Sequence, residues 1–189
     1  MKKIIVSFLL CVFTVTASAQ IVKNLEYPKA HFGIRAAFTS NSVRTGDDFY
    51  DNHSKAKTFV SGGLALDFRV ASIPLYLETG MYYMSKGYKH DEPGSSNDYW
   101  NHSVIMPLLM SYHLYFTDNM AIQPFVGPYV GYGCDKDDEG RVDYGIRAGL
   151  GWNFGRLYVN AGYDFGFEVD GYKNNTVFAT IGFNFAGSY

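Results

Sequence analysis

Three residues have the types and the spacing of a nucleophilic triad. Ser111 and His113 are separated by one residue, so they share one face of an extended strand. Glu78 lies in an earlier segment with similar alternation, which would place it on the adjacent strand at a similar height. In such a set the imidazole takes the hydroxyl proton and the carboxylate fixes the imidazole tautomer. No oxyanion donor is identifiable beside them, and isolated Ser and His side chains inside a sheet usually serve as hydrogen-bonded packing. We therefore expect no catalytic residue and no enzyme.

Seven charged residues fall on the polar face of segments in which polar and apolar residues alternate. They are Arg35, Asp67, Arg69, Glu78, Asp143, Arg147 and Asp164. In a closed barrel these side chains would point into the lumen, where an unpaired charge is costly. We therefore predict a lumen charge network in which Arg147 pairs with Asp164, and Arg35 reaches either Asp67 or Glu78.

One acidic segment has the beginning of a calcium-binding loop. In Asp135-Lys-Asp-Asp-Glu-Gly140 carboxylates stand at positions 1, 3 and 5, and glycine stands at position 6. The twelfth position is Ile146, where such a loop needs a bidentate glutamate. The histidines that would lie in loops, His53, His90 and His102, are scattered along the chain. We expect neither a metal nor a cofactor.

Strands are the elements that would position all of these residues. In 142–154 the alternate residues from Tyr144 to Phe154 are apolar or aromatic and share one face, while small and polar residues share the other. The same alternation is clear in residues 32–39, 157–166 and 177–185, and weaker in 58–69, 75–85, 102–115 and 120–132. Pro107 lacks a backbone N–H and suggests a β-bulge in its segment.

The connections between these eight segments alternate in length. Those at 41–57, 86–101, 134–141 and 167–175 are long, whereas those at 70–74, 116–119 and 155–156 are short. Short periplasmic turns and longer extracellular loops around an even number of strands are typical of outer membrane barrels. This arrangement would place both termini in the periplasm.

The composition of the polar face indicates which face of the strands would line the inside of the barrel. A water-soluble barrel would expose a face rich in Lys, Glu and Thr, yet no strand assigned here contains a lysine. On the other face aromatic residues gather near both strand ends, as in the interfacial belts of membrane barrels. We predict an all-β fold, a closed eight-stranded antiparallel up-and-down transmembrane β-barrel. An exported soluble barrel that binds an apolar ligand is the alternative.

The N-terminal residues form an export signal. Lys2 and Lys3 precede an apolar run from Ile4 to Val15, and the small residues Ala17-Ser18-Ala19 follow. We predict a cleavable signal peptide at 1–19, a short periplasmic segment at 20–29 and the barrel at 30–189. The chain has 16 Lys and Arg residues against 18 Asp and Glu residues, a net charge of −2. This balance leaves no basic surplus for phosphates, so we expect no nucleic-acid partner.

Four short segments give a family resemblance. They are Tyr76-Leu-Glu-Thr-Gly80, Ile105-Met-Pro-Leu-Leu-Met110, Pro124-Phe-Val-Gly-Pro-Tyr-Val-Gly131 and Gly145-Ile-Arg-Ala-Gly-Leu-Gly151. Together they resemble the PorT-type outer membrane β-barrel family of Gram-negative Bacteroidota, small eight-stranded barrels like OmpA and OmpX. The resemblance implies a cell outer membrane location, contact with lipid and lipopolysaccharide, and insertion by the barrel assembly machinery. The alternation ends at Phe185 rather than at the last residue, so either Phe185 or Tyr189 would be the terminal assembly signal.

The expected function follows from the size of the barrel. The interior of eight strands is just filled by side chains, so we exclude a general diffusion porin. We predict a non-enzymatic protein with an envelope-structural or surface-interaction role through its long extracellular loops. Phe49, Tyr50 and Trp100 are the candidate contacts for an unknown extracellular partner. Some eight-stranded barrels modify lipid A, so a lipid-A hydrolase that uses Ser111, His113 and Glu78 is an alternative.

Overall fold

The computed structural model describes residues 28–44, 54–70, 72–92, 95–117, 119–135, 142–169 and 171–188. In these ranges the chain forms β1 (Ala30–Arg44), β2 (Ser54–Arg69), β3 (Leu75–Glu92), β4 (Ser95–Tyr112), β5 (Leu114–Thr117), β6 (Met120–Gly133), β7 (Val142–Phe154), β8 (Leu157–Val169) and β9 (Tyr172–Ser188). The predicted signal peptide at 1–19, and the predicted periplasmic segment except residues 28 and 29, lie outside the described residues.

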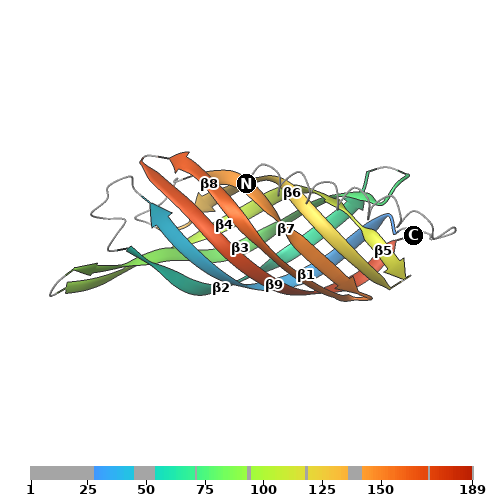
Figure 1. Cartoon of the computed structure of the whole chain (residues 1–189), viewed down its shortest axis with the longest axis horizontal. Helices are drawn as coiled ribbons and strands as arrows, with labels where there is room; N and C mark the ends of the chain where they lie inside the picture. Colours follow the sequence, from blue (N-terminus) through green and yellow to red (C-terminus); the bar gives the residue numbers. More distant parts are fainter. Residues whose placement is uncertain are drawn as a thin grey trace, which may run out of the picture.

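Antiparallel ladders close these strands into a ring. The strand order is β4–β3–β2–β1–β9–β8–β7–β6–β5, and a further ladder joins β4 to β6 (Figure 1). β4 and β5 are two parts of one wall strand, because both pair with β6 and only His113 separates them. The barrel therefore has eight strands, and the predicted fold is confirmed. Among the described residues, no helix is long and apolar enough to cross a membrane.

The two ends of the barrel differ. One end, here called the turn end, carries the connections 70–74 and 155–156, the start of β1 and the last residues of β9. The opposite end, the hairpin end, carries the other ends of the same strands. At this end β3 continues to Glu92 and β4 begins at Ser95.

The strands at the hairpin end are longer than the sequence predicted. Most of the expected loop 86–101 is a β-hairpin, and the expected loops 41–57 and 167–175 also lose residues to the strands on either side. Alternation marks a strand only where its two faces meet different surroundings. Backbone pairing needs only partners for the N–H and C=O groups, so it continues beyond the alternating part.

Pro107 does not cause the predicted bulge. β4 faces β3 in one register on both sides of the proline, with Leu108 opposite Thr79 and Ile105 opposite Tyr82. The Thr79 hydroxyl donates a hydrogen bond to the Pro107 carbonyl oxygen at 3.0 Å. This side-chain bond joins the two strands where the backbone ladder is interrupted, and no inserted residue is needed.

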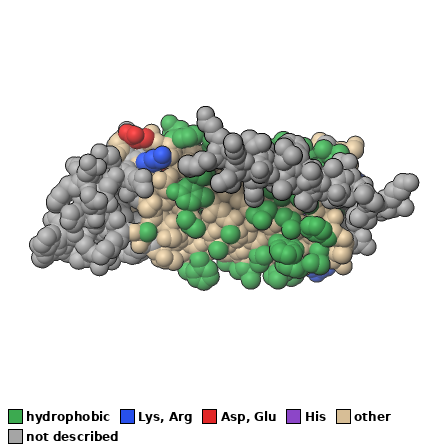
Figure 2. Space-filling view, viewed as in Figure 1, with side chains coloured by type: hydrophobic (Ala, Val, Ile, Leu, Met, Phe, Trp, Pro, Cys, Tyr) green, Lys and Arg blue, Asp and Glu red, His purple; other side chains and the backbone are tan. Residues whose placement is uncertain are grey.

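The barrel wall separates an apolar outer face from a polar inner face. Phe38 leaves 64% of its surface exposed on the outside, whereas its neighbour Thr39 leaves 1%. Figure 2 shows hydrophobic side chains over the visible part of the wall. Aromatic rings also meet on the outer face at the turn end, where Trp152 and Phe154 stack with their centroids 5.0 Å apart. The alternative, a soluble barrel whose alternating apolar residues face inward, is therefore excluded, because these residues lie on the outer face.

Candidate functional site: the charged lumen

A buried ion pair lies inside the barrel between β7 and β8. Arg147 and Asp164 stand opposite each other in the ladder. The guanidinium donates two hydrogen bonds to the carboxylate, from Nε to Oδ1 at 2.7 Å and from Nη2 to Oδ2 at 2.8 Å. Arg147 also lies over the Phe178 ring, with Cζ 4.6 Å from the centroid. The structure thus brings together the two residues that the sequence expected to pair.

A second ion pair joins β3 to β7. The Lys86 ammonium donates a hydrogen bond to the Asp143 carboxylate, and Lys86 itself is buried. Sequence reasoning missed Lys86, because it placed residue 86 in a loop. The signal was nevertheless present, since Lys86 has the same parity as the inward-facing Glu78 and therefore lies on the same face of the strand.

Arg35 occupies the lumen without an acidic partner among the described residues. Its Nη2 donates to Asn184 Oδ1 at 2.8 Å, and its guanidinium carbon lies 4.3 Å from the centroid of the Tyr158 ring. Gly182 faces Arg35 across the ladder, and a Cβ at this glycine would lie 2.3 Å from Arg35 Cδ. The absence of a side chain at residue 182 therefore makes room for the arginine. The predicted bond from Arg35 to Asp67 or Glu78 is not formed.

Asp67 and Glu78 are instead direct neighbours of each other. They stand opposite in the β2–β3 ladder, and both are buried. Asp67 Oδ2 lies 3.9 Å from Nδ1 of His31, which is its ladder neighbour on β1. Arg69, the remaining charged residue of the predicted network, lies two residues farther along β2, toward the turn end, and is only half-buried.

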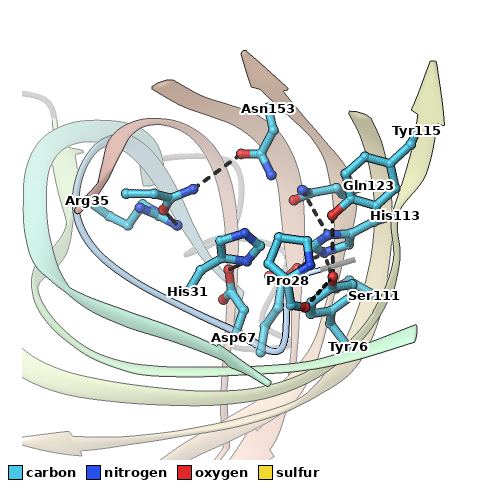
Figure 3. Close-up of polar contacts among 12 residues, drawn as sticks. Pro28, His31, Arg35, Asp67, Tyr76, Ser111, His113, Tyr115, Gln123 and Asn153 are labelled. Carbon is cyan, nitrogen blue, oxygen red and sulfur yellow. Dashed lines mark hydrogen bonds and ion pairs between the residues drawn. The ribbon is translucent and has the colours of Figure 1, made fainter. Parts of the chain in front are cut away.

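The three residues of the predicted triad do come together, but not in the order that a relay needs. Ser111 Oγ lies 3.1 Å from His113 Nε2 (Figure 3). Glu78 Oε1 lies 3.7 Å from the same nitrogen. The amide nitrogen of Gln123 occupies the other side of the ring, 3.3 Å from Nδ1. A catalytic relay places the hydroxyl and the carboxylate on opposite ring nitrogens. Here the Glu78 carboxylate and the Ser111 hydroxyl approach the same ring nitrogen, so the carboxylate does not orient the imidazole toward the serine.

Sequence reasoning missed Gln123. The prolines in its segment, at 124 and 128, make the inward face of residues 120–132 only weakly defined in the sequence. In the structure Gln123 is 1% exposed and points toward His113 (Figure 3). Alternation with the buried Phe125 and Tyr129 gives the same face, but only once the strand is known to continue through both prolines.

An aromatic stack covers the lumen at the turn end. The Tyr76 ring stacks on the His113 ring with the centroids 3.8 Å apart. The Tyr76 hydroxyl donates to the carbonyl oxygen of Pro28 at 2.8 Å and lies 3.3 Å from the Tyr115 hydroxyl (Figure 3). Pro28 is buried, so the chain that enters β1 crosses this end of the lumen. The wall, the stack and this crossing segment together enclose His113.

The structure describes only part of the remaining predicted sites. Phe49 and Tyr50 lie outside the described residues, and Trp100 lies in β4 rather than in a loop, with its side chain outside the description. Of the acidic segment 135–140, only Asp135 is described. Within the described ranges, no group of three or more His, Cys, Asp or Glu residues could hold a metal ion.

A family model matches most of the chain. The model of the outer membrane protein β-barrel domain matches residues 19–168. The chain belongs to this family. The protein is therefore a small outer membrane β-barrel, and its location is the outer membrane. A search of curated proteins finds no match to the chain.

Solved structures of small outer membrane proteins have a similar fold. OprG from Pseudomonas aeruginosa is 12% identical, with a TM-score of 0.54, over 86% of this chain and 99% of that chain. Neisserial surface protein A is 14% identical, with a TM-score of 0.47, over 83% of this chain and 97% of the other. Ail, the attachment invasion locus protein of Yersinia pestis, is 12% identical, with a TM-score of 0.44, over 85% and 100%. At such low identity the likeness to OprG concerns the fold alone.

Proposed function

We propose that this barrel is a non-enzymatic surface-interaction protein whose β3–β4 hairpin contacts a partner outside the cell. Within its family it would be a PorT-type member, with both termini in the periplasm and the hairpin end outside. Its lumen is filled by ion pairs and aromatic side chains, and an eight-stranded wall leaves little further room. A role in the passage of solutes is therefore not favoured. We place the function instead on the surface at the hairpin end.

The β3–β4 hairpin is the observation that carries this proposal. β4 pairs with β6 only from Ser103 to Ser111, whereas its ladder with β3 continues as far as Ser95. In the described part of the chain, residues 95–100 thus have a strand ladder on one side only. Figure 1 shows this green hairpin extending beyond the rest of the wall. The edge of such a sheet offers backbone N–H and C=O groups to an extended segment of a partner.

The geometry at Ser111 supports the non-enzymatic part of the proposal. A lipid-A hydrolase would need the hydroxyl, the imidazole and the carboxylate in sequence, together with access for an acyl chain. Here Ser111 is 1% exposed, His113 is 0% exposed, and both lie on the lumen side of the wall. The acyl chains of the membrane would lie against the opposite, apolar face.

The experiment compares cells that display the wild-type barrel with cells that display a shortened hairpin. Residues 88–99 are replaced by Asn-Gly, a turn that suits a two-residue hairpin and leaves Lys86 in place. Adherence is measured to wells coated with fibronectin, mucin or lipopolysaccharide. We expect the wild type to adhere to at least one surface, and the shortened variant to lose that adherence.

Two further variants separate the candidate contacts. Trp100→Ala tests the hairpin, and a paired Phe49→Ala and Tyr50→Ala variant tests the loop between β1 and β2. Each variant must still migrate differently on a gel before and after boiling, which shows that its barrel is closed. Equal adherence of the wild type and the shortened hairpin on all three surfaces would refute the proposal.

A further inference from the structure

A cavity of about 30 Å³ lies inside the barrel. Its polar lining includes Arg35 on β1, Asp67 on β2, Glu78 on β3, Arg147 on β7 and Asn160 on β8, together with hydroxyl groups such as that of Tyr158. One water needs roughly 10–15 Å³ of such volume, so the cavity has room for about two species of that size. Of the triad-like residues Ser111, His113 and Glu78, only Glu78 lines this cavity.

Two oxygen atoms of the cavity lining lack a hydrogen-bond donor. They are Glu78 Oε1 and Asn160 Oδ1, which are buried and receive no hydrogen bond from the described residues. Glu78 is only 9% exposed, and its nearest basic nitrogen, His113 Nε2, is 3.7 Å away. Asn160 already donates from Nδ2 to the Tyr158 hydroxyl at 2.9 Å, so its oxygen is the end left over. A buried oxygen without a partner is costly, and a carboxylate oxygen is the more costly of the two.

The charges around this cavity do not balance. Arg147 is bonded to Asp164 and Lys86 to Asp143, so these two pairs are neutral. Near the cavity one cation, Arg35, remains with two carboxylates, Asp67 and Glu78. With both carboxylates ionised and with His31 and His113 neutral, this leaves one excess negative charge in a largely buried space. An uncompensated buried charge is strongly unfavourable.

We propose that the cavity binds one monovalent alkali-metal cation, such as Na⁺, between the Glu78 carboxylate and the Asn160 amide oxygen. Oxygen atoms are the ligands that such hard cations take. One positive charge restores neutrality, and one ion together with one water fits the volume. Water alone would satisfy both oxygen atoms but would leave the excess charge. A divalent ion would reverse its sign, and the described residues include no set of three acidic or histidine ligands for one.

The test measures the heat-unfolding midpoint of the purified full-length mature barrel in detergent, at mildly alkaline pH. The midpoint is compared in sodium chloride and in choline chloride at equal ionic strength, because choline is too large for the cavity. We expect the wild type to unfold about 3 °C higher in sodium, the shift that a modest binding free energy gives for a chain of this length.

Variants tie this sodium dependence to the cavity. Glu78→Gln keeps the shape of the side chain and removes the charge, so the sodium dependence should disappear. Asn160→Leu removes the second oxygen and should reduce it. Glu168→Gln is the matched control, because Glu168 is exposed and lies outside the cavity. Every variant is first checked for a closed barrel by its migration before and after boiling.

Two results would overturn the cation site. One is a wild-type midpoint that is equal in sodium and choline, which would mean that a proton or protein reorganisation supplies the missing charge. The other is a sodium dependence that persists in Glu78→Gln, which would place the effect elsewhere on the molecule.

Discussion

The ion pair between Arg147 and Asp164 gives a sharp test of how the lumen is held together. The perturbation removes one partner at a time, in Asp164→Leu and Arg147→Met, and then both in the double variant. Asp164 is 0% exposed and Arg147 is 6% exposed, so neither group can recover its hydration when the other is lost. Two hydrogen bonds, at 2.7 and 2.8 Å, are broken in each single variant.

The expected loss of stability is large for each single variant and small for the double variant. Breaking a buried, hydrogen-bonded ion pair by removing one partner costs about 3–5 kcal/mol in the free energy of unfolding. For a chain of this length that corresponds to a lower unfolding midpoint by roughly 6–20 °C. Replacing both partners by apolar residues of similar size is often neutral. The guanidinium carbon of Arg147 lies over the Phe178 ring, and methionine is a flexible apolar side chain that can fill the space beside this ring.

The assay is unfolding of the barrel in lipid vesicles with increasing urea, read as the fraction that migrates in the folded position on an unboiled gel. The three variants and the wild type form a double-mutant cycle, which isolates the coupling between the two residues. Glu168→Leu is the control, because Glu168 faces Lys173 on the exposed surface and such a pair contributes about 0.2–1 kcal/mol. A double variant as unstable as the two single changes added together would refute the reasoning.

Three further predictions concern other parts of the lumen. Gly149→Ala should lower the unfolding free energy by about 1–3 kcal/mol, because its Cβ would lie 2.5 Å from the Phe125 ring, and urea unfolding measures this. Tyr76→Phe should lower the unfolding free energy by about 1 kcal/mol, because the hydrogen bond to Pro28 is lost. It should also speed proteolysis of the chain before β1. Unchanged proteolysis would show that this bond does not hold the segment. Ser111→Ala should leave the mass spectrum of lipid A identical to that of cells with the wild type, since the serine is not oriented for attack.

The strands of the barrel wall could be predicted from the sequence, because the membrane requires polar and apolar residues to alternate along them. Phe38 and Thr39 are neighbours with opposite surroundings, and every strand between the bilayer and the lumen repeats that contrast. The same contrast identifies the inward charges Arg147 and Asp164. The two strands that flank a short connection are also expected to pair, because consecutive strands usually lie side by side.

Two features could not be predicted because their causes are not local in the sequence. The β3–β4 hairpin extends past the alternating segment, where both faces meet similar surroundings and only backbone pairing defines the strand. Arg35 bonds to Asn184 on β9, the last strand, which pairs with β1 when the barrel closes, while Asp67 lies opposite His31 on β1. Counting along consecutive strands compares Arg35 with β2 and β3 only, so it does not show what the closing strand offers.

The distribution of charges divides the lumen into two parts with different properties. Between β3, β7 and β8, ion pairs balance each acid with a base and leave nothing for a ligand to supply. Nearer the turn end, Arg35 bonds to an amide and is one cation beside two carboxylates. Separating a buried ion pair would leave each charge uncompensated, so the pairs of the first part stay together. The second part keeps an oxygen of Glu78 and an oxygen of Asn160 without a hydrogen-bond donor, and it is there that the proposed cation would bind.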